Sequence, residues 1–156
     1  MEHKTFLKQA VEQAFKGMRA GKGGPSGAVV VRNGQVIGEG HNTVLESLDP
    51  TAHAEVNAIR NACKKVKDYH LTGAVIYTNF EPCPMCLAAI YWADIRHIFY
   101  SAGRETARQI GFMDGFLYEE ISRPMVEREM DYSRIKLTEM TLLVDEWMNM
   151  KGKILY

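Results

Sequence analysis

The sequence predicts an α/β fold in which helices cover both faces of a mixed β-sheet. One observation is a hairpin pattern over 27–38, where two apolar runs flank Asn33-Gly34, a strong turn signal between antiparallel strands. The other is a strand–helix–strand pattern over 74–100, which predicts a crossover between parallel strands. Because crossover helices must pack back onto the sheet, the two patterns together predict helices on both faces.

The other elements follow from hydrophobic periodicity. Residues 5–20 carry an apolar side chain every three to four positions and end at a group of glycines, which predicts a first helix. Residues 51–67 follow Asp49-Pro50 and place their apolar side chains on one stripe, which predicts a second helix. Glycines interrupt the pattern beyond residue 100, and only 142–150 again resembles a helix. The remaining predicted elements are strands at 27–32, 35–38, 74–78 and 97–100 and a helix at 84–93.

Composition excludes several classes of protein. A chain of 156 residues with 46% hydrophobic residues can form one domain, 1–156, with its own core. Lysine plus arginine equals aspartate plus glutamate at 19 each, so no net positive charge attracts nucleic acid or an acidic membrane. The chain has no apolar run of about 18 residues and no secretory signal at its start, which predicts a cytoplasmic protein. Its three cysteines favour metal or redox chemistry over a disulfide framework.

A metal site is predicted from two helix starts. Cys83-Pro84-Met85-Cys86 places two thiols at the beginning of the helix at 84–93, where the helix dipole lowers thiol pKa values and makes thiolates available to zinc. His53 at the start of the preceding helix is the candidate third ligand. Three protein ligands leave a fourth position for water, as in catalytic zinc sites. Glu55 is then the candidate acid–base group that transfers protons from that water to the substrate.

Each half of this pattern has another interpretation. Cys83 and Cys86 could form a redox pair or half of a structural zinc site, and the histidine–glutamate spacing is weak evidence when it stands alone. Cys63 lies on the apolar stripe of its helix and is expected in the core. The combination of both motifs, each opening a helix, is specific: a histidine and glutamate one residue apart, followed by Pro-Cys-x-x-Cys, is the signature of zinc nucleobase deaminases.

At these motifs the sequence resembles the cytidine deaminase superfamily, and within it the small bacterial guanine deaminases. The resemblance implies a three-layer cytidine-deaminase-like fold with a five-stranded mixed sheet. It also implies one zinc ion per chain and hydrolysis of guanine to xanthine and ammonia. The segments that carry the resemblance are Gly24 to Val31, His41-Asn42, Asp49 to Glu55, Glu81 to Cys86, Ile90 to Ala93, and Gly111 to Asp114.

The resemblance also implies how the base is recognised. Asn42 matches an asparagine that hydrogen-bonds the base, and Asp114 matches a carboxylate that accepts the N–H donors of guanine. Without that resemblance, Asn42 could be a turn residue and Asp114 a solvated loop residue. Ser26 departs from the aromatic residue expected in guanine deaminases, which leaves room for another aminated heterocycle, such as a triazine or a different purine.

Two further activities fit the same motifs. A tRNA adenosine deaminase would share the zinc ligands and Glu55, but a tRNA arm requires clustered lysine and arginine. This sequence has only isolated pairs such as Lys64-Lys65, which a dimer would have to bring together. A zinc-stabilised interaction module would need a fourth protein ligand, and no histidine stands at a spacing that suggests one.

The chain ends on Ile154-Leu155-Tyr156, which is unusually apolar for a terminus. We expect Tyr156 to close the base pocket. The resemblance implies that the segment from about 115 to 156 is exchanged between the subunits of a homodimer. The alternative is that this tail only covers the surface of its own domain.

Overall fold

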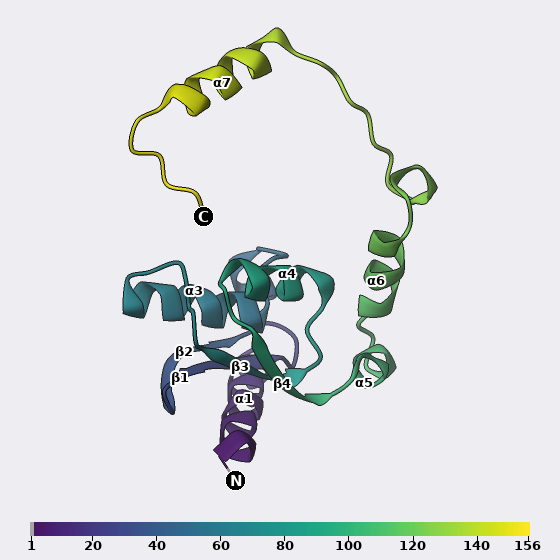
Figure 1. The fold of residues 1–156 in the computed structure, drawn as a ribbon. Coiled ribbons are helices and arrows are strands. Elements are labelled where there is room, and N and C mark those ends of the chain that lie inside the picture. Colours follow the sequence, from purple (N-terminus) through teal and green to yellow (C-terminus); the bar gives the residue numbers. More distant parts are fainter. Residues whose placement is uncertain (1) are drawn as a thin grey trace. The chain divides into compact units, whose positions relative to one another are not determined.

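A mixed sheet of four strands lies in the larger of two units into which contacts divide the chain, Met1–Glu119 and Glu120–Tyr156. The computed structural model describes residues 2–156. Strand β1 pairs antiparallel with β2 and with β3, and β3 pairs parallel with β4. The predicted α/β class, hairpin and crossover are therefore confirmed (Figure 1). The strands, in the spatial order β2-β1-β3-β4, are β1 (Gly27–Arg32), β2 (Gln35–His41), β3 (Val75–Phe80) and β4 (His97–Ala102).

The expectation of five strands is wrong, because the sheet within residues 2–156 has four. The residues that follow β4 form a helix instead, α5 (Arg104–Gln109), which Gly103 precedes as N-cap. The Glu81 carboxylate accepts a hydrogen bond from the backbone N–H of Arg104 at 3.2 Å, which satisfies a donor at the start of that helix. The sequence of α5 also lacks the β-branched alternation of a strand, so β4 remains at the edge of the sheet.

Helix α1 (Glu2–Arg19) covers one face of the sheet (Figure 1). Its buried side chains Phe6 and Ala10 pack against Val29 and Val31 of β1 and against Tyr77 of β3. Alternate residues of β1 therefore face α1, as the period of two in a strand requires.

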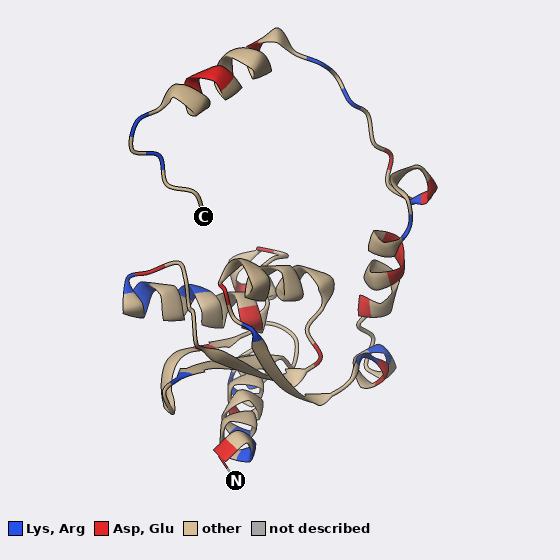
Figure 2. Ribbon diagram, in the orientation of Figure 1, with Lys and Arg blue, Asp and Glu red and all other residues tan. Residues whose placement is uncertain are grey.

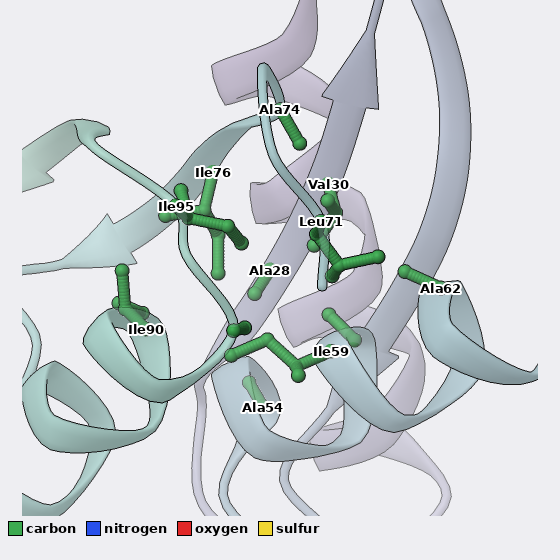
Figure 3. Packing of buried hydrophobic residues seen from close by; sticks show 12 residues of the cluster. Ala28, Val30, Ala54, Ile59, Ala62, Leu71, Ala74, Ile76, Ile90 and Ile95 are labelled. Atoms are coloured by element: carbon green, nitrogen blue, oxygen red, sulfur yellow. The ribbon is translucent and has the colours of Figure 1, made fainter. Parts of the chain in front are cut away.

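Helices α3 (Ala54–Val66) and α4 (Pro84–Trp92) cover the other face. Ala28 and Val30 of β1 and Ile76 of β3 point into this layer, where Ile59 of α3 and Ile90 of α4 meet them (Figure 3). All five side chains are at most 9% exposed. The layer is the main hydrophobic core, and it holds the two helices in place on the sheet.

Two glycines of β2 let α3 approach the sheet closely. A Cβ atom at Gly38 would lie 2.4 Å from the carbonyl oxygen of Ala58, and one at Gly40 would lie 2.5 Å from that of Ala54. Both contacts are far shorter than ordinary van der Waals distances and involve the helix backbone. The missing side chains therefore fix the depth and the position of the first turns of α3.

Helix α3 begins three residues later than predicted. The Asp49 carboxylate accepts hydrogen bonds from the Thr51 backbone N–H at 2.8 Å and from its hydroxyl at 2.7 Å, which folds 49–52 into a turn. His53 is the N-cap, in extended conformation, and Ala54 is the first helical residue. A short helix that the sequence did not predict, α2 (Val44–Ser47), precedes this turn.

Beyond α5 the chain continues through α6 (Asp114–Ser122), a 3₁₀ turn (Met125–Glu127) and α7 (Thr138–Asn149). The helix predicted at 142–150 is present but starts four residues earlier. None of its residues is buried in the described chain, and large apolar side chains such as Leu142 and Leu143 are exposed. Within residues 2–156, no helix combines the length and the apolar character that crossing a membrane requires.

Candidate active site

The three predicted metal ligands lie together. The Nδ1 atom of His53 is 3.6 Å from the Cys83 sulfur and 3.5 Å from the Cys86 sulfur. Their donor atoms all lie within 4.8 Å of one another. Within residues 2–156, this is the one group of three or more candidate ligands that lies so close together. One imidazole and two thiols are a donor set that suits zinc, and three ligands leave the fourth position of a catalytic site.

Two helix starts place these ligands. His53 is the N-cap of α3, and Cys83 is the N-cap of α4, with extended backbone at φ −69° and −68° respectively. Pro84 is the first helical residue of α4, where its missing N–H removes no hydrogen bond. Cys86 lies in the first turn and is fully buried. The predicted convergence of two helix N-termini on one site is therefore present.

Cys83 and Cys86 shift each other's pKa values in opposite directions. The hydrogen bond from Cys86, together with the imidazole of His53, lowers the pKa of Cys83 to about 4 against the opposing effect of burial. The same hydrogen bond, with burial, raises the pKa of Cys86. The hydrogen bond to Cys83 raises the pKa of His53. A lowered pKa favours the thiolate form of Cys83, which is the form that binds a cation.

Glu55 lies beside the ligands and is 4% exposed. The Cys86 thiol contacts its Oε2 atom at 3.4 Å, and the Thr78 hydroxyl contacts its Oε1 atom at 3.5 Å, which is long for a hydrogen bond. Burial is the main cause that raises the pKa of Glu55. A raised pKa makes a carboxyl group a stronger base than a free one, which suits a general acid–base group. Thr78, on β3, was not predicted.

The pocket beside His53 and Cys83 collects residues from distant parts of the sequence. Ser26 and Asn42, at the ends of β1 and β2, line it together with Glu55 and with Asp114 at the start of α6. The sequence therefore identified polar residues that share one pocket. Its remaining lining residues, which the sequence did not predict, are Pro25, Phe80, Glu81, Ala107 and Phe112.

Asn42 is held by the loops around it. Its Oδ1 atom accepts a hydrogen bond from the Val44 backbone N–H at 3.0 Å, and its own backbone N–H donates to the Ser26 carbonyl oxygen at 3.0 Å. A Cβ atom at Gly23 would lie 2.1 Å from that Oδ1 atom, so glycine is required there. Because Oδ1 is bound to the backbone, the amide nitrogen is the group that can donate to a ligand.

Asp114 is half-buried in the same pocket. Burial raises the pKa of its carboxyl group, with a further contribution from the charge of Cys83, while His53 acts in the opposite direction. Phe112 lines the pocket two residues before it, and a Cβ atom at Gly24 would lie 2.7 Å from its ring. Gly24 therefore makes room for an aromatic wall. Tyr156 belongs to the second unit, Glu120–Tyr156, and is 81% exposed.

Comparison with known proteins agrees with this geometry. Residues 1–102 match the family model of the cytidine and deoxycytidylate deaminase zinc-binding region. A guanine deaminase from Bacillus subtilis is 50% identical over 153 residues, which cover 98% of both chains. An X-ray structure of guanine deaminase from Bacillus subtilis, 49% identical, covers 100% of this chain and 99% of its own, with a TM-score of 0.95.

A second group of relatives matches a smaller part of the chain. A tRNA-specific adenosine deaminase from Aquifex aeolicus is 39% identical over 102 residues, which are 65% of this chain and 67% of that protein. Zinc is thus the cofactor that both the family and the histidine–cysteine–cysteine group indicate. The chain therefore belongs to the cytidine and deoxycytidylate deaminase zinc-binding family and is, like its full-length relative, a hydrolase that removes amino groups.

Proposed function

We propose that this protein is a guanine deaminase, which hydrolyses free guanine to xanthine and ammonia. The observation that carries the proposal is the pocket that combines the zinc-binding group with Glu55 and Asp114. Every zinc deaminase needs the zinc-binding group and the glutamate, whatever its base. The additional carboxylate of Asp114 suits a base edge that carries N–H donors. Guanine has such an edge at N1 and N2. The full-length relative with the same overall fold is a guanine deaminase.

In this proposal His53, Cys83 and Cys86 hold the zinc ion. When bound, zinc acts as a Lewis acid that lowers the pKa of water and makes hydroxide available near neutral pH. A carboxylate oxygen of Glu55 accepts one proton from the attacking water and delivers it to a ring nitrogen of guanine. It then accepts the second proton of that water, from the hydroxyl group that has added to C2, and passes it to the leaving amino group. Burial of Glu55 keeps these transfers away from bulk water.

Asp114 and Asn42 orient the base in complementary ways. The Asp114 carboxylate accepts hydrogen bonds from N1–H and N2–H of guanine, and the Asn42 amide nitrogen donates to an acceptor of the ring. A base without the N–H donors leaves the half-buried carboxylate unpaired, which costs binding free energy. Ser26 supplies a hydroxyl where an aromatic residue is expected, and Phe112 offers an aromatic wall in the same pocket.

We further propose that the working form is a homodimer with exchanged C-terminal segments, from about 115 to 156, in which Tyr156 closes the pocket. Large apolar side chains are exposed on α7, and Tyr91 and Trp92 at the end of α4 are 59% and 70% exposed. Apolar area of this kind is usually covered by a partner surface.

We also propose a cytoplasmic location, because the zinc-binding group needs reduced thiols and the cytoplasm keeps thiols reduced.

Deamination of tRNA adenosine is the weaker alternative. Relatives with that activity match about two thirds of this chain. Basic and acidic residues are equal in number, and both are spread over the ribbon in Figure 2. Recognition of a tRNA arm would need a concentrated basic surface.

The test is ammonia release by the zinc-loaded protein from guanine, adenine, cytosine, their nucleosides, aminated triazines and tRNA. We expect guanine to be the best substrate. Robust inosine formation in tRNA, with no ammonia from guanine, would replace the proposal with the tRNA activity. Glu55→Gln is the matched control, because it keeps the size of the side chain and removes its acid–base function. We expect it to bind zinc and to lose activity by a factor of about 10²–10⁴.

A further inference from the structure

Helix α6 begins with Asp114, whose carboxylate lines the pocket, and one turn later it forms a hydrogen bond with the loop that carries Cys83. Asp114 is its first residue, and Tyr118 follows four positions on, on the same face of the helix. The Tyr118 hydroxyl donates a hydrogen bond of 2.7 Å to the carbonyl oxygen of Pro82. Pro82 is buried and directly precedes Cys83. One hydrogen bond therefore connects the helix that carries Asp114 to the loop that carries a metal ligand.

Arg104 braces this connection. Its guanidinium carbon lies 4.2 Å from the centroid of the Tyr118 ring, and its Nε atom donates to the Oε1 atom of Glu81 at 3.2 Å. Its Nη2 atom donates to the same oxygen, and its backbone N–H donates to the other carboxylate oxygen at 3.2 Å. A planar guanidinium can stack on the ring and bind the carboxylate at the same time. Arg104 thus links the ring of Tyr118 to Glu81, the first residue of the loop that carries Cys83.

Hydrophobic burial of the first turns of α6 is incomplete. Phe116 and Leu117, its apolar residues next to Tyr118, are 41% and 42% exposed. The hydrogen bond of the Tyr118 hydroxyl and the stacking of its ring on Arg104 are specific contacts that connect this part of the helix to neighbouring segments. A helix held in this way can rotate or shift when one contact is lost, and its first residue then moves within the pocket.

We infer that Tyr118 is a positioning residue for base recognition, which holds the Asp114 carboxylate at the distance from the metal site that guanine requires. The inference rests on the proposed role of Asp114. Tyr118 touches neither the base nor the metal ligands in this scheme. It acts through the position of α6, and Arg104 acts through the orientation of the Tyr118 ring.

The test begins with Tyr118→Phe, which keeps the ring and its stacking on Arg104 and removes one hydrogen bond. We expect KM for guanine to rise by about three- to tenfold, the range that corresponds to one hydrogen bond. We expect kcat to change less than about twofold and zinc content to stay at one ion per chain. Arg104→Lys should raise KM in the same direction, because an ammonium group cannot stack and bridge as a guanidinium does. Tyr100→Phe, at a 49% exposed position on β4, is the matched control and should leave KM unchanged.

A double-mutant cycle separates positioning from general support of the fold. In an Asp114→Asn background, Tyr118→Phe should add no further increase in KM, because the residue through which it acts has lost its carboxylate. The inference would be overturned if the KM increases of the two single variants multiply in the double variant. It would also be overturned if Tyr118→Phe lowers kcat and zinc content equally.

The two proposals fail in different ways. If wild-type protein releases no ammonia from guanine, or if Asp114→Asn leaves KM unchanged, the proposed base recognition is wrong and the inference falls with it. If Asp114→Asn raises KM and Tyr118→Phe does not, the proposed function stands and only the positioning role is overturned.

Discussion

Gly40→Ala should damage both the stability and the activity of this protein, although position 40 makes no contact with the substrate pocket. The new Cβ atom would lie 2.5 Å from the Ala54 carbonyl oxygen and 2.5 Å from the Ala58 backbone nitrogen. Ordinary van der Waals contact starts at 3.4 Å, so the backbone of α3 and strand β2 would have to separate by about 0.9 Å at this point. Because these are backbone atoms of a packed helix, they cannot relieve the clash by rotating away as a flexible side chain could.

The expected losses in stability and activity follow from the packing of the first turns of α3 and from the position of His53 and Glu55 there. Forcing a methyl group into a filled core costs about 1–3 kcal/mol of unfolding free energy. His53 and Glu55 stand at the end of α3 that would move, and a misplacement of about 1 Å at a catalytic site can cost about 10²-fold in rate. We therefore expect a loss of about 1–3 kcal/mol in unfolding free energy and about a 100-fold fall in kcat/KM.

The assay combines denaturant unfolding of the zinc-loaded protein with ammonia release from guanine. Gly115→Ala is the matched control for stability, because a Cβ atom there would meet nothing within 4 Å and its backbone needs no left-handed conformation. It should leave the unfolding free energy within about 1 kcal/mol of wild type. Wild-type stability and activity in Gly40→Ala would refute the conclusion that this glycine fixes the depth of α3.

Three more predictions address the site and the tail. Cys83→Ala should bind far less zinc than the one ion per chain expected of wild type, as elemental analysis would measure; full metal content would mean that other ligands hold the ion. Ser26→Phe should lower KM for guanine if the serine leaves a void, because stacking a base on an aromatic side chain contributes about 1–3 kcal/mol; a collapse of activity would indicate that the hydroxyl contacts the substrate. Deleting residues 152–156 should lower kcat/KM at normal zinc content and fold, and unchanged kcat/KM would exclude Tyr156 as a lid. Mixing the truncated chain with the Glu55→Gln chain should restore activity if one subunit's tail serves the other's pocket.

The metal centre could be predicted because its signals are local. Pro84 after Cys83 marks a helix start, the spacing of Cys83 and Cys86 fits one turn, and His53 stands at the start of another helix. Each of these features depends on residues a few positions apart, where backbone geometry is set by sequence. The asparagine–glycine turn of the hairpin and the period of α1 are local in the same sense.

The number of strands and the start of α3 depended on more than periodicity. The family resemblance implied a fifth strand, whereas the residues after β4 form α5, whose first N–H is bound by the Glu81 carboxylate from 23 residues earlier. Helix α3 starts at Ala54 because Asp49 binds Thr51 in a turn, and a hydrophobic pattern does not register such a bond.

The sequence by itself indicated the reaction class, because the motifs that contain His53, Glu55, Cys83 and Cys86 resemble the signature of the zinc deaminases. It also determined the layered α/β class through the hairpin and the crossover. Only the tertiary structure decided which further residues line the pocket and which residues support it. Phe112 reaches the pocket because Gly24 has no side chain, Thr78 lies beside Glu55 because β3 runs under the site, and Tyr118 meets Pro82 from 36 residues away. Such contacts join segments that have no periodic relation in the sequence, so they appear only when the chain is packed.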